Sequence, residues 1–387
     1  MGRRAFVIVL DACGAGALPD AGEYGDAGTN TLGHLSEAVG GLDLPVMGAL
    51  GLGSALALEG VAPAEDPVLH GRLHAVGAGK DTTSGHWELM GVVTPTPLRT
   101  YPDGFPPEIL APLREATGRD VLCNRPYNGI GVIEDFGAEH VRTGALIVYT
   151  SADSVLQIAA HEDVVPRAEL YAACEAARAI MTGEHTVGRV IARPFVGQPG
   201  RFRRTTGRRD HSIDPPRRSY LEELRDSGLP VHAVGKVSQV FAGVGIDAEH
   251  PGSTNQAAIE STDRLMDELE SGLVFANLVE TDQVYGHRND TEGFHGALQR
   301  IDRAVGGWVA RLDPARDLLV LTADHGCDPT TPGTDHTREH VPLLASFAGH
   351  GGRRHDGPLA DVGASVLLWL TGHGPADDGL PGAPFVP

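Results

Sequence analysis

The chain has 387 residues, of which 41% are hydrophobic, so it is long enough for about two to three domains and a sizeable core. Its formal net charge of -20 argues against a generic nucleic-acid or anionic-membrane binder, because such partners would be repelled. No segment approaches the roughly 20 apolar residues of a membrane span. The four scattered cysteines lack paired metal-ligand spacing and indicate a reduced, cytoplasmic location.

The chain begins with a short apolar run, Ala5–Leu10, that ends in Asp11. The arginines before this run resemble the start of an export signal, but Asp11 interrupts the apolar stretch too early for one. We therefore predict a buried first strand with a carboxylate at its carboxyl end.

A glycine-led turn, GKDTTSG from Gly79, comes next and offers the hydroxyl groups of Thr82, Thr83 and Ser84. The residues that follow predict a short helix, whose first amides attract phosphate oxygens. One of these hydroxyls is a candidate nucleophile for phosphoryl transfer, although helix capping is the commoner use of such residues. The spacing does not choose among the three.

The middle of the chain carries no candidate metal ligands. A proline-rich stretch from Val92 and an arginine-rich stretch from Arg201 bound it, and strand-like runs at Ala145–Tyr149 and Val187–Phe195 lie inside it. The predicted domains are a core, residues 1–95 with 216–387, and an inserted α/β cap, residues 96–215. A cap that closes over a site would exclude water, which a transferase needs more than a hydrolase does.

Basic residues are distributed unevenly. Nine arginines lie between Arg189 and Arg218, and phosphate groups are their obvious partners, although several must be plain surface residues. Lysine occurs only as Lys80 and Lys236, both in glycine-led turns. This scarcity makes the two lysines candidates for sites that need a compact ammonium group, although chance is the alternative.

Apolar runs and helical stripes alternate in the last third of the chain. The predicted strands are Val231–Val234, Leu273–Val279, Leu318–Thr322 and Leu343–Phe347, and the predicted helices are Asn255–Glu270 and Gly293–Leu312. This alternation predicts a mostly parallel sheet that is covered by helices on both faces.

Acids and histidines follow two of these strands, as Asp11 follows the first strand. They are Asp282, His287, Asp324, His325 and His336. The carboxyl ends of parallel strands meet at one edge of a sheet, where ligands bind. Carboxylates and imidazoles suit Mn²⁺, Mg²⁺ or Zn²⁺, and seven donors, counting one hydroxyl, suit two ions that clamp a phosphoryl group.

Taken together, the chain resembles the metal-dependent phosphopentomutases of the alkaline phosphatase superfamily. The motifs that carry the resemblance are PDAGEYGDAGTNTLGHL from Pro19, GKDTTSGHWELMG from Gly79, YTSADSVLQIAAHE from Tyr149, VGRVIARPFVG from Val187, GHRND from Gly286, TADHG from Thr322 and GTDHTREHVPLL from Gly333. The resemblance spans nearly the whole chain and implies an α/β fold, an alkaline-phosphatase-like core with a mostly parallel sheet and a smaller inserted α/β cap.

The resemblance also implies the site residues. The nucleophile is Thr82. One ion is held by Asp11, Thr82, Asp324 and His325, and the other by Asp282, His287 and His336. The residues that bind the sugar phosphate are Asp153, Ser154, Arg189, Arg204 and Lys236. Three positions depart from the expected pattern, since Ala12, the Thr83–Ser84 pair and Thr281 replace a serine, a Met-Thr pair and an aromatic residue. None of these removes a ligand.

The reaction implied is the interconversion of α-D-ribose 1-phosphate, or its 2-deoxy form, with the 5-phosphate. It runs through a phosphothreonine and a 1,5-bisphosphate, with two Mn²⁺ and a priming bisphosphate such as glucose 1,6-bisphosphate. The implied partners are small-molecule sugar phosphates, and the sequence indicates no oligomeric state. The alternatives are a metal-dependent phosphatase or phosphodiesterase, including the related phosphoglycerate mutases with a serine nucleophile, and a non-catalytic metal-binding protein. The threonine and the cap segments argue against a phosphatase, a phosphodiesterase or a phosphoglycerate mutase.

Overall fold

The computed structural model describes residues 2–151, 154–349, 351–376 and 379–387. The chain divides into two compact units. Unit 1 comprises Met1–Pro97 with Pro215–Pro387, and unit 2 comprises Leu98–Asp214. The predicted boundaries, after residue 95 and after residue 215, lie close to these positions.

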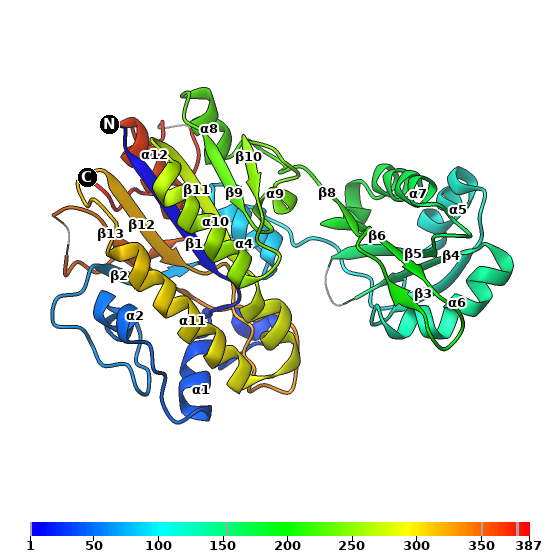
Figure 1. Ribbon diagram of the computed structural model, residues 1–387, viewed down its shortest axis with the longest axis horizontal. Coiled ribbons are helices and arrows are strands. Elements are labelled where there is room, and N and C mark those ends of the chain that lie inside the picture. The colour runs from blue at the N-terminus through cyan, green and yellow to red at the C-terminus, as the bar shows by residue number, and fades with distance from the viewer. Residues whose placement is uncertain (1, 152–153, 350, 377–378) are drawn as a thin grey trace. The chain divides into compact units, whose positions relative to one another are not determined.

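Unit 1 is built on an eight-stranded sheet (Figure 1). Its strands, in spatial order, are β10 (Ala248–His250), β9 (Val231–Val234), β11 (Gly272–Leu278), β1 (Arg4–Leu10), β12 (Asp317–Thr322), β13 (Val341–Ser346), β2 (Leu69–His74) and β14 (Gly357–Pro358). The five strands from β10 to β12 are parallel, and β13 is antiparallel to both of its neighbours. The sheet is therefore mostly parallel, as predicted.

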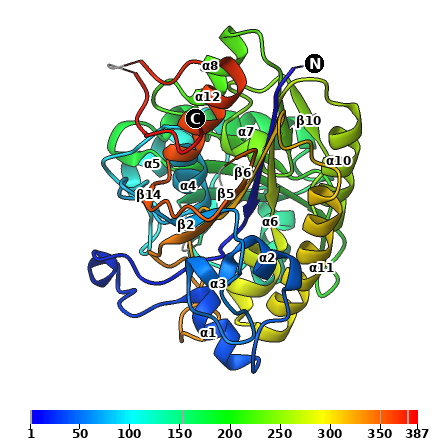
Figure 2. The same cartoon turned by 90° about the vertical axis from the view of Figure 1, so that its left-hand side faces the viewer.

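Helices cover both faces of this sheet. They are α1 (Thr31–Ala38), α2 (Pro45–Leu50), α3 (Leu52–Ala55), α4 (Thr82–Leu89), α8 (Tyr220–Asp226), α9 (Val237–Val240), α10 (Asn255–Glu268), α11 (Thr291–Val309) and α12 (Asp361–Thr371). Helices α10 and α11 pack together in front of the sheet in Figure 1, and α4 contacts α9 and α12. Helices α1, α2 and α3 lie together beside α11 (Figure 2).

The three central strands bring their carboxyl ends to one edge of the sheet. Every residue of β1, β11 and β12 is buried, because parallel strands that are covered on both faces consist of continuous apolar runs. β1 lies between the other two, with Leu10 opposite Leu278 of β11 and Val9 opposite Thr322 of β12. The residues that follow these strands therefore emerge next to one another.

Unit 2 has its own sheet and its own core. The strands are β3 (Val121–Pro126), β4 (Leu146–Thr150), β5 (Val155–His161), β6 (Arg189–Val196) and β7 (Arg203–Arg204), with β8 (Arg209–Ser212) also paired to β6. The helices are α5 (Pro107–Thr117), α6 (Gly131–Thr143) and α7 (Arg167–Ile180). Separate apolar clusters pack α5 and α7 against the sheet on one side and α6 on the other. The sheet is mixed, because β4 runs antiparallel to β5.

The predicted α/β fold class is confirmed, and each of the seven predicted strands is present. The sequence prediction missed β2, β3 and β5, and it missed the short strands β7, β8, β10 and β14. Among the described residues, no helix is long and apolar enough to cross a membrane.

An ion pair fixes β1 beside β12 at the end opposite the candidate ligands. The Arg4 guanidinium donates to both carboxylate oxygens of Asp317, over 2.7 and 2.6 Å, and both residues are buried. We predict that Asp317→Asn lowers the free energy of unfolding by about 3–5 kcal/mol, because it leaves a buried cation without its counter-charge. Urea denaturation followed by circular dichroism measures the loss.

The matched control is Glu268→Gln, which removes the exposed partner of Arg264 one helical turn away. An exposed pair of this kind contributes about 0.3–0.5 kcal/mol. A similarly small loss for Asp317→Asn would contradict the prediction.

Candidate metal centre and nucleophile

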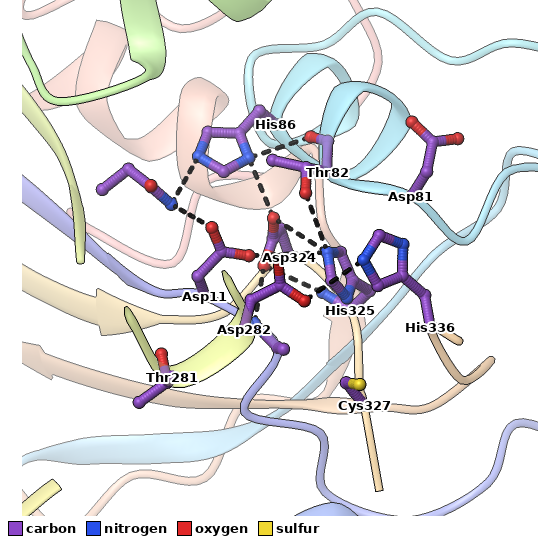
Figure 3. A network of polar contacts seen from close by, with 12 residues as sticks. Asp11, Asp81, Thr82, His86, Thr281, Asp282, Asp324, His325, Cys327 and His336 are labelled. Atoms are coloured by element: carbon purple, nitrogen blue, oxygen red, sulfur yellow. Dashed lines mark hydrogen bonds and ion pairs between the residues drawn. The ribbon is translucent and has the colours of Figure 1, made fainter. Parts of the chain in front are cut away.

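Three carboxylates converge at the carboxyl edge of the unit 1 sheet (Figure 3). Asp11 follows β1, Asp324 follows β12, and Asp282 lies in a π-helical turn, Thr281–Tyr285, after β11. Their exposed fractions are 0%, 3% and 3%. Isolated π-helical turns occur mostly at functional sites, where they displace one residue from the regular helical path.

Three histidines surround these carboxylates. The His325 Nε2 atom lies 3.5 Å from Asp11 Oδ1 and 3.4 Å from Asp324 Oδ2. Asp282 Oδ1 lies 3.2 Å from His336 Nε2 and 3.3 Å from His287 Nε2. The donors thus form two overlapping groups, one around Asp11, Asp324 and His325 and the other around Asp282.

Hydrogen bonds from two of the histidines to the backbone set the ring tautomers. His325 Nδ1 is 3.0 Å from the Gly326 carbonyl, and His287 Nδ1 is 2.6 Å from the Thr334 carbonyl. A carbonyl only accepts, so each Nδ1 carries the proton and each Nε2 presents a lone pair to the carboxylates. This arrangement is typical of metal-ligating histidines.

The carboxylate oxygens that face these lone pairs are buried and poorly compensated. No described residue donates to Asp11 Oδ1 or Asp282 Oδ1, and Asp324 Oδ2 has His86 Nδ1 3.0 Å away. Buried carboxylate oxygens need hydrogen bonds or cations as compensation. The donor set of carboxylate oxygens and imidazole nitrogens therefore fits divalent metal ions of intermediate hardness.

The electrostatics of the site agree with this fit. Burial raises the pKa of Asp11 well above its ordinary value, and the neighbouring Asp324 and Asp282 raise it further. Burial also opposes ionisation of Asp282, but His336, His287 and Lys236 lower its pKa below the ordinary value. A site of this kind holds all three carboxylates ionised only if positive charge lies among them.

The three candidate hydroxyls are distinguished by their contacts at the start of α4. Asp81 caps the helix, accepting from the amides of Thr83 and Ser84 over 2.9 and 3.2 Å. The Ser84 hydroxyl completes this capping box by accepting from the Asp81 amide over 3.2 Å, and it also donates to the Asp81 carboxylate over 2.9 Å. Thr83 is buried. The Thr82 hydroxyl points to His325, with Oγ1 3.2 Å from Nε2 (Figure 3).

The turn that carries Thr82 is held tightly against the metal-ligand segments. A Cβ atom on Gly85 would lie 2.4 Å from the Asp324 carbonyl oxygen, so only glycine allows α4 to approach so closely. The buried Arg338 donates to the carbonyls of Gly77 and Gly79 over 2.7 and 2.8 Å. Helix α4 therefore begins at a fixed position beside the carboxylates.

The two lysines have different surroundings. Lys80 forms an ion pair with Asp26, 2.9 Å away, and so ties the nucleophile turn to the loop before α1. Lys236 follows β9 and places its Nζ atom 3.8 Å from Asp11 Oδ2. Only Lys236 of the two therefore lies beside the carboxylates.

The remaining candidate residues belong to unit 2. The buried Ser154 hydroxyl donates to the Arg99 carbonyl over 2.6 Å and accepts from the Gly188 amide over 3.1 Å. Arg189 begins β6, and the exposed Arg204 donates to the Gly129 carbonyl over 3.0 Å. Asp153 lies outside the described residues. The role of these residues in binding sugar phosphate stays a prediction.

The sequence analysis missed two residues that contact the carboxylates and underestimated a third. Asn277 on β11 and His86 on α4 are fully buried and reach Asp11 and Asp324, respectively. A polar residue within the apolar run of β11 was a signal that could have identified Asn277. Cys327, which the sequence analysis counted only among the scattered cysteines, is buried, and its Sγ atom lies within 4.8 Å of ligand atoms of Asp282 and His287.

Comparisons with known proteins identify the fold and the family of the chain. The family model of the metalloenzyme superfamily matches residues 3–371. Two solved structures share the fold. One is the PH0037 protein of Pyrococcus horikoshii, which is 15% identical with a TM-score of 0.51, and the match covers 97% of this chain and 99% of that protein. The other is a phosphoglycerate mutase of Leishmania mexicana, which is 16% identical with a TM-score of 0.50, and the match covers 100% of this chain and 98% of that protein.

Curated relatives are much closer in sequence. A phosphopentomutase of Anaeromyxobacter dehalogenans is 52% identical over 378 residues, which is 96% of each chain. A phosphopentomutase of Caldanaerobacter subterraneus is 52% identical over 344 residues, 88% of this chain and 87% of its own. The chain therefore belongs to the phosphopentomutase family, a group of isomerases within the metalloenzyme superfamily.

Proposed function

We propose that the chain interconverts α-D-ribose 1-phosphate, or 2-deoxyribose 1-phosphate, with the corresponding 5-phosphate. The single observation that carries this proposal is the position of the Thr82 hydroxyl, 3.2 Å from His325 within a cluster of buried carboxylates. Family membership supports the reaction class. The four cysteines are free thiols, which supports the proposed cytoplasmic location.

Two divalent ions are part of the proposal, Mn²⁺ in the first instance, with Mg²⁺ and Zn²⁺ admissible. The residues that would hold one ion are Asp11, Thr82, Asp324 and His325, and those that would hold the other are Asp282, His287 and His336. When bound, such ions offset the charge of a phosphoryl group and favour ionisation of a nearby hydroxyl.

Thr82 exchanges a phosphoryl group with the sugar. The phosphoryl group on Thr82 Oγ1 passes to the 5-hydroxyl of ribose 1-phosphate, and the hydroxyl proton ends on Oγ1. The resulting 1,5-bisphosphate returns its 1-phosphoryl group to Thr82, which leaves ribose 5-phosphate. Glucose 1,6-bisphosphate supplies the first phosphoryl group. The Lys236 ammonium stabilises the negative charge of the group in transfer.

Residues of unit 2 bind the sugar phosphate in this proposal. Arg189 and Arg204 carry guanidinium groups, which bind phosphate oxygens bidentately, and Asp153 is proposed to bind the sugar hydroxyls. Ser154 has its hydroxyl engaged by two backbone groups, and its carbonyl accepts from the Arg189 amide over 3.3 Å. Its contribution is therefore to hold the chain next to Arg189.

The identity of the nucleophile is tested by a pair of neighbouring threonine variants. We predict that Thr82→Ala abolishes the conversion of ribose 1-phosphate to ribose 5-phosphate, because it removes the oxygen that carries the phosphoryl group. Thr83→Ala should retain most of the activity, since Thr83 is buried beside the site. Intact mass after incubation with glucose 1,6-bisphosphate should increase by one phosphoryl group in the wild type and in Thr83→Ala only. The reverse pattern would move the nucleophile to Thr83, and an unmodified wild-type chain would favour a non-catalytic metal-binding protein.

Metal removal tests the dependence on ions. We predict that treatment with a chelator abolishes mutase activity and that Mn²⁺ restores it, because three buried carboxylates lose the charge that compensates them. The assay follows ribose 5-phosphate and inorganic phosphate together. Release of inorganic phosphate at a rate comparable with isomerisation would indicate a phosphatase or phosphodiesterase, and full activity after chelation would contradict the ion requirement.

A further inference from the structure

A buried hydrogen-bond chain links Asp11 and Asp324 behind the candidate metal centre. It runs through Asn277 on β11 and His86 on α4, both of which are fully buried. Figure 3 shows His86 beside Asp324. The Asn277 Nδ2 atom lies 3.1 Å from Asp11 Oδ2 and 3.3 Å from His86 Nε2. Neither contact involves Asp11 Oδ1, the oxygen that faces His325.

Chemistry fixes the direction of each bond in this chain. A carboxylate accepts, so the atom that faces Asp11 must be the amide nitrogen of Asn277, which donates its second hydrogen to His86. His86 Nε2 is then an acceptor, and the ring proton lies on Nδ1. That atom is 3.0 Å from the Thr82 carbonyl oxygen and 3.0 Å from Asp324 Oδ2. One amide and one imidazole therefore serve two carboxylates and the backbone of the nucleophile.

The remaining contacts of both carboxylates complete the restraint. Asp324 Oδ1 accepts from the Ala12 amide over 3.2 Å, at a residue whose φ of 64° lies in the left-handed region. A non-glycine residue in that region costs of order 1–3 kcal/mol and persists where the surrounding structure imposes it. The turn after Asp11 is thus drawn to Asp324, and Asp11 presents its donor-free oxygen to His325.

We propose that Asn277 and His86 are positioning residues for the ion held by Asp11, Thr82, Asp324 and His325. They orient both carboxylates of that ion and couple them to the first turn of α4. Among the described residues, no hydrogen bond joins Asn277 or His86 to Asp282 or His287, which would hold the second ion together with His336. The inference rests on the two-ion centre of the proposed function.

The test is Mn²⁺ binding without substrate, measured as free Mn²⁺ by electron paramagnetic resonance during titration of the full chain. We expect the wild type to bind two ions. Asn277→Leu and His86→Leu should weaken one binding step about 10–100-fold, the usual effect of losing a partner that orients a ligand, and leave the other unchanged. His86→Asn keeps a hydrogen-bond donor near the position of Nδ1. The Mn²⁺ affinity of this variant should therefore lie closer to the wild-type affinity than to the affinity of His86→Leu.

Two controls separate this effect from general destabilisation. Trp87→Phe removes a buried hydrogen bond to the Val240 carbonyl from the same helix, and it should leave both binding steps unchanged. His287→Ala should weaken only the other step. Wild-type affinities in folded Asn277→Leu, or equal loss of both steps, would overturn the inference, and Asn277→Ala with His86→Ala gives the same decision if the leucine variants do not fold. Because no sugar phosphate is present, the outcome is independent of whether the chain isomerises ribose 1-phosphate.

Discussion

The burial of Asp11, Asp282 and Asp324 within one small volume is the constraint on which the rest of the structure depends. Burying an ionised carboxylate costs several kcal/mol, and like charges nearby add to that cost. The histidines offer lone pairs instead of protons, because backbone carbonyls hold the Nδ1 protons of His325 and His287. Divalent cations are the compensation that such a site requires, and a hydroxyl beside them is in the position that phosphoryl transfer needs.

The fold meets this constraint through strand order. β1 lies between β11 and β12, so the residues after three strands emerge at one edge, although Asp11 is far in sequence from Asp282 and Asp324. At the far end of the same strands, the Arg4–Asp317 pair fixes β1 beside β12. Between the two ends the strands are apolar throughout, and the close contact at Gly85 holds α4 against the Asp324 segment. Rigid elements thus position the carboxylates and the candidate nucleophile Thr82.

The sequence predicted much of the fold and of the site because both depend on local patterns. An apolar run that ends in an acid identifies a buried strand and the polar residue at its end, which is how Asp11 and Asp324 were recognised. Which strands are neighbours is a property of the whole sheet, so the contacts of Asn277 with Asp11 and of His86 with Asp324 could not be read from spacing. β2 and β5 were missed because LHGRLH and VLQIAAH mix polar residues into short strands. Thr82, Thr83 and Ser84 were equivalent by spacing, since their contacts depend on the capping geometry of α4.

Anomalous diffraction from crystals grown with Mn²⁺ tests the central claim most directly. Data collected at the manganese absorption edge locate the ions independently of turnover and of any assumption about substrate. The account predicts two anomalous peaks among the three carboxylates, one next to Thr82 Oγ1 and His325 and the other next to Asp282 and His336. Absence of ordered manganese among these side chains, in crystals that contain the ion at saturating concentration, would contradict it.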